Sequence, residues 1–233
     1  MSENSKKKIE NFKRDLRINQ QNISNLSVKI RKFIQQIRFE TIKKLKEKEN
    51  ETDLENIEII NAILERLLEE MIISPNFDKI NGFIKKKNEL EDQKIHDQIQ
   101  KLKKKNFDYF GLPNQLSKID WSLSSRILRT FNICKLPYEF LNVLLTTADS
   151  VFHTINSNIL NHDIQSEPNK LVTGDDFLPI FVFVLVNSQI ENLVSISEYL
   201  IDYSDPKEMN HESGYYLTTF CSSIQFIKTS ENL

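Results

Sequence analysis

Glycine is scarce in this chain, which holds only four glycines among its 233 residues. Glycine reaches positive φ angles at little cost, so few positions here can form the tight turns of a β protein. Hydrophobic residues make up 39% of the chain and charged residues 27%, a composition typical of a globular protein rather than a disordered one. The shortage of glycine therefore favours a fold of long helices.

Cysteine and histidine are also few, and their spacing predicts no metal site. Cys134 and Cys221 lie far apart, no CxxC pair exists, and the four histidines do not group with them. We therefore expect two reduced thiols, as in a cytoplasmic protein. The sequence has no nucleophile–base pair and no glycine loop that would bind phosphate, so we expect neither a cofactor nor a metabolic enzyme.

Segments that would hold the chain in a membrane are missing as well. The N-terminal MSENSKKK lacks the apolar core of a signal peptide, Ser2 does not fit the myristoylation pattern, and the C-terminal SENL has no prenylation cysteine. The longest apolar run, Phe177 to Val186, has ten residues and is too short to cross a bilayer. Any peripheral membrane contact should come through a partner or through the basic N-terminal half.

Charge is unevenly spread along the chain. Residues 1–105 hold 24 Lys and Arg against 18 Asp and Glu, a net charge of +6, whereas residues 106–233 hold 7 against 15, a net charge of −8. Two lysine triplets, 85–87 and 103–105, indicate a solvated helix face or, alternatively, a surface attracted to anionic lipid at about 1 kcal/mol per basic residue. Clustered arginines with interleaved aromatic residues are absent, so nucleic acid is not expected as a partner.

Apolar residues recur at helical spacing in the first half of the chain. Residues 1–8 are predicted to be frayed, a helix to run from about 9 to 48, and a second helix to follow a cap at Thr52 or Asp53 and to end at Ser74-Pro75. A charged helix is predicted at about 84–104. The shared faces are Leu26, Ile30, Phe33 and Ile37 in the first helix and Ile57, Ile60, Leu64, Leu67 and Met71 in the second.

Helical patterns continue in the second half, and no β-hairpin signal is found, so the predicted fold class is all-α. The run 181–186 has strand-like propensity, but Asp175-Asp176 followed by Pro179 is typical of a helix start, with an acidic cap and a proline in the first turn. The predicted helices are 124–134, 138–155, 176–187, 191–203 and 213–228, with a polar loop at 156–174.

The last three predicted helices are joined by short connections, so neighbours should pack antiparallel and the N-termini of the first and third should meet. The residues brought together would be Asp175, Asp176, Gly214, Tyr215, Tyr216 and Thr218. On spacing alone, both acids can equally well cap and solvate the helix, and the tyrosines can be core or rim aromatics. If Asp176 caps, Asp175 projects near the positive end of the helix, which stabilises the anion by about 0.3–1 kcal/mol.

Two segments of this patch, LVTGDDFLPIFVFVLV and SGYYLTTFCSSIQFI, resemble the signature of the vacuolar-protein-sorting-nine domain family. ILRTFNICKLPYEFLNVLLTTADSVFHTI is similar to the family's helix–proline–helix segment, EDQKIHDQIQKLKKKNFDYFGLP to its start, and AILERLLEEMIISPNF to the helical bundle before it. The resemblance covers residues 26–230. It implies a flexible or helical extension at 1–25, a helical bundle at 26–82 and an all-helical exchange domain at 83–230.

The resemblance also implies a function, guanine nucleotide exchange on an endosomal Rab GTPase of the Rab-five and Rab-twenty-one class. It makes Asp175 the catalytic acid, which enters the nucleotide site, engages the phosphate-binding lysine and disfavours magnesium. No bond is broken, so the protein is expected to be no enzyme in the covalent sense. The implied GTPase-binding residues are Pro179, Tyr215, Thr218, Asp176, Gly214 and Tyr216. We expect a monomer that is recruited from the cytoplasm to endosomal membranes.

Two segments depart from the family's pattern. The chain has NSQIE at 187–191 where Lys-Ala-Asn-Pro-Pro is frequent, and YEFL at 138–141 where Arg-Asp-Lys-Leu is usual. They bear on the choice of Rab more than on activity. The alternative they leave open is a non-catalytic helical adaptor or tether with a degenerate exchange domain, which would bind its GTPase without preferring the nucleotide-free form.

Overall fold

The structure is a computed structural model that describes residues 3–16, 23–48, 54–112, 116, 118–160 and 174–230. Within these ranges the regular elements are helices and there is no strand, so the predicted all-α class is confirmed. The α-helices are α1 (Glu3–Asp15), α2 (Ile23–Lys48), α3 (Leu54–Ile72), α4 (Phe77–Leu102), α5 (Ser122–Arg129), α6 (Pro137–Leu160), α7 (Gly174–Asn187), α8 (Leu193–Tyr203) and α9 (Glu212–Thr229). Shorter 3₁₀ turns include η1 (Ser74–Asn76), η2 (Phe107–Phe110), η4 (Thr130–Ile133) and η5 (Glu208–Asn210).

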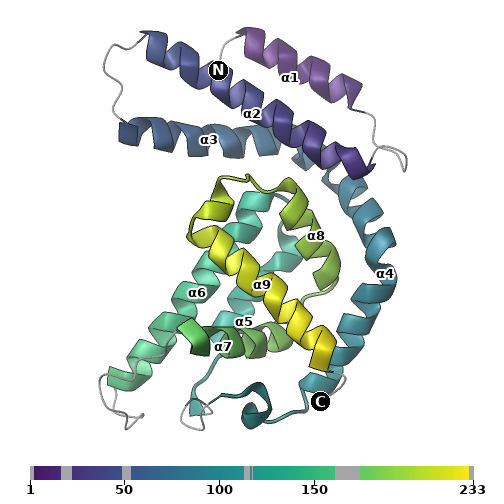
Figure 1. Cartoon of the computed structure of the whole chain (residues 1–233), viewed down its shortest axis with the longest axis vertical. Coiled ribbons are helices and arrows are strands. Elements are labelled where there is room, and N and C mark those ends of the chain that lie inside the picture. The colour runs from purple at the N-terminus through teal and green to yellow at the C-terminus, as the bar shows by residue number, and fades with distance from the viewer. Residues whose placement is uncertain are drawn as a thin grey trace.

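The helices form two groups that α4 connects. Helices α1, α2 and α3 lie together at one end of the molecule, and α5 to α9 pack around one another at the other end (Figure 1). Helix α4 runs along one side and contacts both α8 and α9. We call α1–α3 the bundle and α5–α9 the core helices.

The first helices differ from their prediction. In place of one helix over 9–48, α1 and α2 are separate helices that pack side by side, with the rings of Phe12 and Phe33 stacked at a centroid distance of 3.9 Å. Residues 3–8, predicted to be frayed, are helical. The apolar spacing continues through both helices, so periodicity alone could not reveal the reversal of the chain.

Helix α3 is rotated relative to the predicted face, and α4 starts earlier than predicted, at Phe77. Leu67 was expected inside but is 44% exposed, whereas Leu68 is fully buried. The rotation follows from Glu65 and Glu69, which are buried and face α2. The predicted caps Thr52 and Asp53 lie outside the described residues.

Two arginines of α2 connect the bundle to the core helices. Arg31 and Arg38 each donate a hydrogen bond to Glu65 of α3 at 2.5 Å. Arg38 also donates to Asp205, which follows α8, and Nη2 of Arg31 lies 3.4 Å from Oδ1 of the same carboxylate. Each of these side chains is at most 10% exposed. The pairs therefore tie α2 and α3 to the segment that leads into α9.

Glu69 of α3 completes this buried charge cluster. Its Oε2 accepts the backbone N–H of Tyr138, at the start of α6, at 3.3 Å, and its Oε1 lies 3.5 Å from Arg31. Burial, and then the charge of Glu65, raise the pKa of Glu69 well above its ordinary value. Two guanidinium groups here face the carboxyl groups of Glu65, Glu69 and Asp205, so the raised pKa of Glu69 reduces the excess of buried negative charge.

We expect Arg38→Ala to lower the free energy of unfolding by about 3–5 kcal/mol, because it leaves the buried carboxylates of Glu65 and Asp205 without one of their partners. Denaturant titration would measure the loss. Lys87→Ala is the matched control, since Lys87 pairs with Glu198 at 2.8 Å but is 68% exposed, and it should cost less than about 1 kcal/mol. Equal small losses in the two variants would contradict a structural role for the cluster.

Candidate functional site

The N-terminal turns of α7 and α9 lie side by side, as the sequence predicted. Phe177 of α7 packs against Tyr216 of α9 with a ring-centroid distance of 5.5 Å. The packing that brings them together differs from the prediction, because α8 packs mainly on α4, while α7 packs on α5 and α9 (Figure 1). The two N-termini meet through direct contact of α7 with α9, and an antiparallel order of three neighbours is not needed.

Four aromatic rings form a row across α6, α7 and α9, in the order Phe152, Phe177, Tyr216, Tyr215. Successive ring centroids are 5.2, 5.5 and 5.2 Å apart. The two inner rings are buried, whereas Phe152 is 37% exposed and Tyr215 is 52% exposed. Leu178, next to the row on α7, is 36% exposed. A buried aromatic centre with exposed aromatic ends is suited to docking another protein.

The candidate catalytic acid lies beside this aromatic row. Asp175 and Asp176 belong to the first turn of α7, which begins at Gly174, two residues earlier than predicted. The helix thus starts before Asp176, and both acids lie within its first turn. Acids in a first turn are favoured by the positive end of the helix dipole, which accounts for the earlier start. The side chains of both acids lie outside the described residues.

Pro179 lies in the second turn of α7, not in the first as predicted, and it is half-buried. A proline has no N–H, so Pro179 cannot donate the helix hydrogen bond that the carbonyl of Asp175, four residues earlier, would otherwise receive. The turn that carries the candidate acid is thereby less constrained by the helix ladder than an ordinary first turn.

The structure separates the residues predicted on α9. Tyr215 and Thr218 are exposed, and the Thr218 hydroxyl donates to the carbonyl of Gly214 at 2.9 Å. Tyr216 is only 5% exposed, and its hydroxyl donates to Glu212 at 3.2 Å. Burial, and then this hydrogen bond, raise the pKa of Tyr216 to about 12. Tyr216 thus belongs to the buried centre of the aromatic row, whereas Tyr215 and Thr218 face outward.

Gly214 is required by a close approach of the backbone. A Cβ atom at this position would lie 2.3 Å from the carbonyl oxygen of Met209, in η5. Only a residue without a side chain fits there, so α9 begins directly against η5. Since Asp205 is held by the buried charge cluster and η5 starts three residues later, the bundle is connected through a short segment to the turn that carries Tyr215.

Sequence reasoning missed Phe152 and Asp149, both on α6. Asp149 is exposed, and its charge is one of the influences that raise the pKa of Tyr216, so it lies near the aromatic row. Both residues share a helix face with Tyr138 and Leu145, at three- and four-residue steps. That face could have been identified from the sequence only if the packing of α6 against α7 and α9 had been known.

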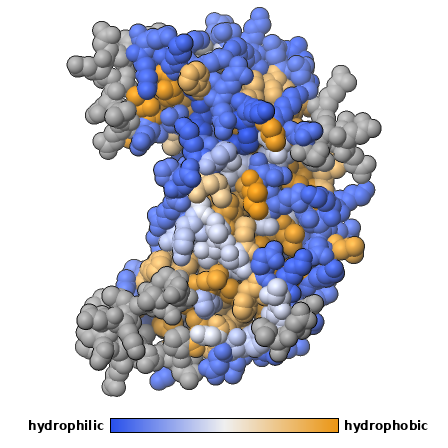
Figure 2. All heavy atoms as spheres, viewed as in Figure 1, coloured by the Kyte–Doolittle hydropathy of each residue, from blue (hydrophilic) through white to orange (hydrophobic). Residues whose placement is uncertain are grey.

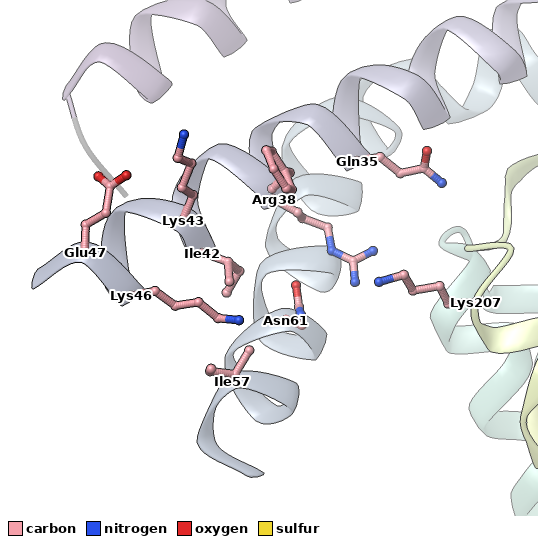
Figure 3. A pocket seen from close by; sticks show the side chains of 10 residues that line it. Gln35, Arg38, Ile42, Lys43, Lys46, Glu47, Ile57, Asn61 and Lys207 are labelled. Carbon is pink, nitrogen blue, oxygen red and sulfur yellow. The ribbon is translucent and has the colours of Figure 1, made fainter. Parts of the chain in front are cut away.

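A groove of about 760 Å³ lies elsewhere, between α2 and α3 of the bundle (Figure 3). Its lining combines the apolar residues Phe39, Ile42 and Ile57 with the lysines Lys43, Lys46 and Lys207. Figure 3 shows Lys207 reaching toward Arg38 from the far side of the groove. None of the lining residues belongs to the aromatic row or to the first turn of α7, so the groove is not part of the candidate site.

Over the described ranges, no three His, Cys, Asp or Glu side chains are grouped so that they could hold a metal ion. In the same part of the chain, every helix is too short or too polar to cross a bilayer.

Residues 121–232 match the family described as the vacuolar sorting protein 9 (VPS9) domain. The match covers just under half of the chain, and it is to the family that the sequence pattern indicated.

Three relatives illustrate how far the similarity extends. The chain is 26% identical over 147 residues to the human GTPase-activating protein and VPS9 domain-containing protein 1, which covers 61% of this chain and 9% of the relative. It is 25% identical to Protein sprint of Drosophila melanogaster, covering 73% and 9%, and 23% identical to human Ras and Rab interactor 3, covering 77% and 18%. The chain thus spans less than a fifth of the length of these relatives.

We expect Gly214→Ala to destabilise the protein by about 1–3 kcal/mol, because the new methyl group has no room against the backbone of Met209. Gly82→Ala, in the middle of α4, is the control: nothing lies within 4 Å of the added Cβ, and alanine should stabilise the helix by about 0.5–1 kcal/mol. Thermal unfolding of the two variants should shift in opposite directions. A shift in the same direction would show that the close approach is not tight.

Proposed function

We propose that this chain is a guanine nucleotide exchange factor that promotes GDP release from an endosomal Rab GTPase of the Rab-five and Rab-twenty-one class. The observation that carries the proposal is the meeting of the first turns of α7 and α9 through Phe177 and Tyr216, since Asp175 belongs to the first of these turns and exposed Tyr215 to the second. The match of this region to the VPS9 family supports it. The Rab class rests on the resemblance of the sequence motifs alone.

The mechanism follows from how a GTPase holds its nucleotide. Lysine and magnesium contacts to the phosphates supply most of the binding, and nanomolar to picomolar affinity corresponds to about 12–16 kcal/mol. In the proposed complex the carboxylate of Asp175 takes the place of phosphate at the lysine and disfavours magnesium. The interaction lowers the barrier to release, and by linkage the exchange factor must bind the empty GTPase more tightly than the loaded one.

The remaining residues have docking roles in this proposal. Tyr215 and Thr218 contact the switch regions, and Pro179 shapes the surface of α7 that they face. Gly214 and Tyr216 act indirectly, by fixing the start of α9 and by supporting the aromatic row from within. Asp176 adds negative charge at the docking surface. We further propose a cytoplasmic monomer that is recruited to endosomal membranes, with a bundle at 26–82 and an exchange domain at 83–230.

We expect Asp175→Ala to reduce the release of fluorescent GDP from the cognate Rab to the spontaneous rate, because the acid that competes with phosphate is gone. The melting temperature should be unchanged, since the substitution lies in the first turn of a helix. Asp176→Ala is the comparison: since Asp176 only adds charge at the docking surface, this variant should bind more weakly but still accelerate release at high concentration. A panel of purified endosomal Rabs tested with the unaltered chain identifies the cognate GTPase first. Full acceleration by Asp175→Ala would remove the acid from its catalytic role.

Tyr215→Ala should weaken binding of the nucleotide-free Rab by about 2 kcal/mol or more, as truncation of an aromatic residue at the centre of an interface does, with little change in stability. Tyr216→Ala should instead lower the free energy of unfolding by about 3–5 kcal/mol, because it empties a buried site. Titration calorimetry and thermal unfolding separate the two effects. A pull-down in which empty and loaded Rab bind equally would favour the non-catalytic adaptor instead.

A further inference from the structure

The aromatic row is too small to be the whole docking surface. Its exposed side chains, with Leu178 and Thr218, number only four, whereas a specific interface buries about 800 Å² per partner and involves roughly 20–30 residues a side. A GTPase domain of roughly 170 residues has a radius of gyration near 15 Å, which corresponds to a diameter of about 40 Å. A partner of this size centred on the row must also cover neighbouring surface.

One face of α6 leads from the aromatic row to the bundle. Tyr138, Leu145, Asp149 and Phe152 share this face, and a helix that rises 1.5 Å per residue carries it over about 21 Å from Tyr138 to Phe152. Asp149 is exposed and Leu145 is half-buried. The distance is about half the width of a GTPase domain, so a partner seated on Phe152 reaches the far end of α6.

Helix α3 packs against the start of α6, at the opposite end of this face from Phe152. The guanidinium of Arg66 lies over the ring of Tyr138, 5.5 Å from its centroid, and the Tyr138 hydroxyl donates to Glu70 at 3.2 Å. Arg66 and Glu70 therefore mark the side of α3 that faces the start of α6. The space-filling view shows the molecule hollowed on one side, between the bundle and the core helices (Figure 2).

An apolar stripe continues from this contact toward the start of α3. Ile59 and Ile63 precede Arg66 and Glu70 in one row at steps of four, three and four residues, so they occupy the same side of the helix. Ile59 is 53% exposed and Ile63 is 51% exposed. Two isoleucines that share a helix face and stand half in solvent beside a proposed docking surface are typical of an interaction site.

We infer that this stripe of α3, Ile59 and Ile63, is a second contact surface for the same GTPase. The inference rests on the proposed function and extends it: the partner docks on the aromatic row, lies along the exposed face of α6, and is met at its other side by the bundle. The bundle then contributes to recognition of the GTPase directly, besides holding the segment before α9. Binding buries the two isoleucines against an apolar part of the GTPase surface.

The test places a charge on the stripe. Ile63→Asp should weaken binding of the nucleotide-free cognate Rab at least fivefold and lower the efficiency of accelerated GDP release by a similar factor. Ile63→Leu keeps the apolar contact and should bind as the unaltered chain does. Since Ile63 is half in solvent, neither variant should change the melting temperature by more than a degree or two.

Phe39→Asp is the matched control, because Phe39 is also an exposed apolar residue of the bundle, at 71%. It lines the groove together with Asn61 of α3. Asn61 and Ile63 are two residues apart, which places them about 200° apart around the helix, so the groove and the stripe lie on opposite sides of α3. Phe39→Asp should leave affinity and exchange unchanged within twofold.

The outcomes separate this inference from the proposed function. Loss of affinity in Ile63→Asp, with Phe39→Asp and Ile63→Leu unaffected, supports the second surface. Normal affinity in Ile63→Asp, while Tyr215→Ala binds weakly, overturns the inference and leaves the exchange function standing. Equal losses in Ile63→Asp and Phe39→Asp also overturn it. If the unaltered chain neither binds nor accelerates any endosomal Rab of the panel, the proposed function fails, and the second surface fails with it.

Discussion

The pairing of Arg38 with Asp205 is the constraint on which the relation between the two helix groups depends. Asp205 follows the end of α8 and begins the segment that contains η5 and leads to α9. Its carboxylate is buried against two guanidinium groups of α2. Taking such charges out of water costs several kcal/mol per ion, so the arrangement persists only if each charge keeps its partner. The bundle therefore cannot shift relative to the core helices without breaking hydrogen bonds that nothing else replaces.

The site benefits from this fixed geometry because its parts come from different helices. Phe152 belongs to α6, Phe177 to α7 and Tyr215 to α9, and each ring is positioned by the packing of its own helix. Exposed residues on rigid helices lose little freedom on binding, which favours affinity. The buried rings Phe177 and Tyr216 pack against the exposed rings Phe152 and Tyr215, so the interior of the protein sets the position of the aromatic residues at its surface.

The sequence predicted the all-α class, the start of α7 to within two residues, and the meeting of the first turns of α7 and α9. It predicted these because acidic helix starts and helical periodicity are local signals. It did not predict that α1 and α2 are separate helices, because apolar spacing continues through both. It also missed the inward orientation of Glu65 and Glu69, since a buried acid becomes intelligible only beside Arg31 and Arg38, more than 25 residues away.

The residues of the candidate site also fall into those that local sequence patterns predict and those that only the tertiary structure reveals. Asp175 and Tyr215 could be recognised from motifs, whereas Phe152 and Ile63 become relevant only once the tertiary structure places them near the row or along its continuation. Gly214 is intermediate. The sequence placed it in the patch at the start of the last predicted helix, but the reason for a glycine there, the carbonyl of Met209, lies in a 3₁₀ turn that helical periodicity does not reveal.

The cluster around Asp205 also bears on how this protein can be divided. A fragment that begins at residue 83 would retain Asp205 and Tyr138 but lose both arginines and Glu69. The carboxylate of Asp205 would then be exposed to water without its guanidinium partners, and the backbone N–H of Tyr138 would lose its acceptor. A cut at the predicted boundary between residues 82 and 83 would therefore separate parts that depend on each other in the folded protein. The bundle and the core helices share one interior, and the smallest piece expected to behave as the whole includes α2 and α3.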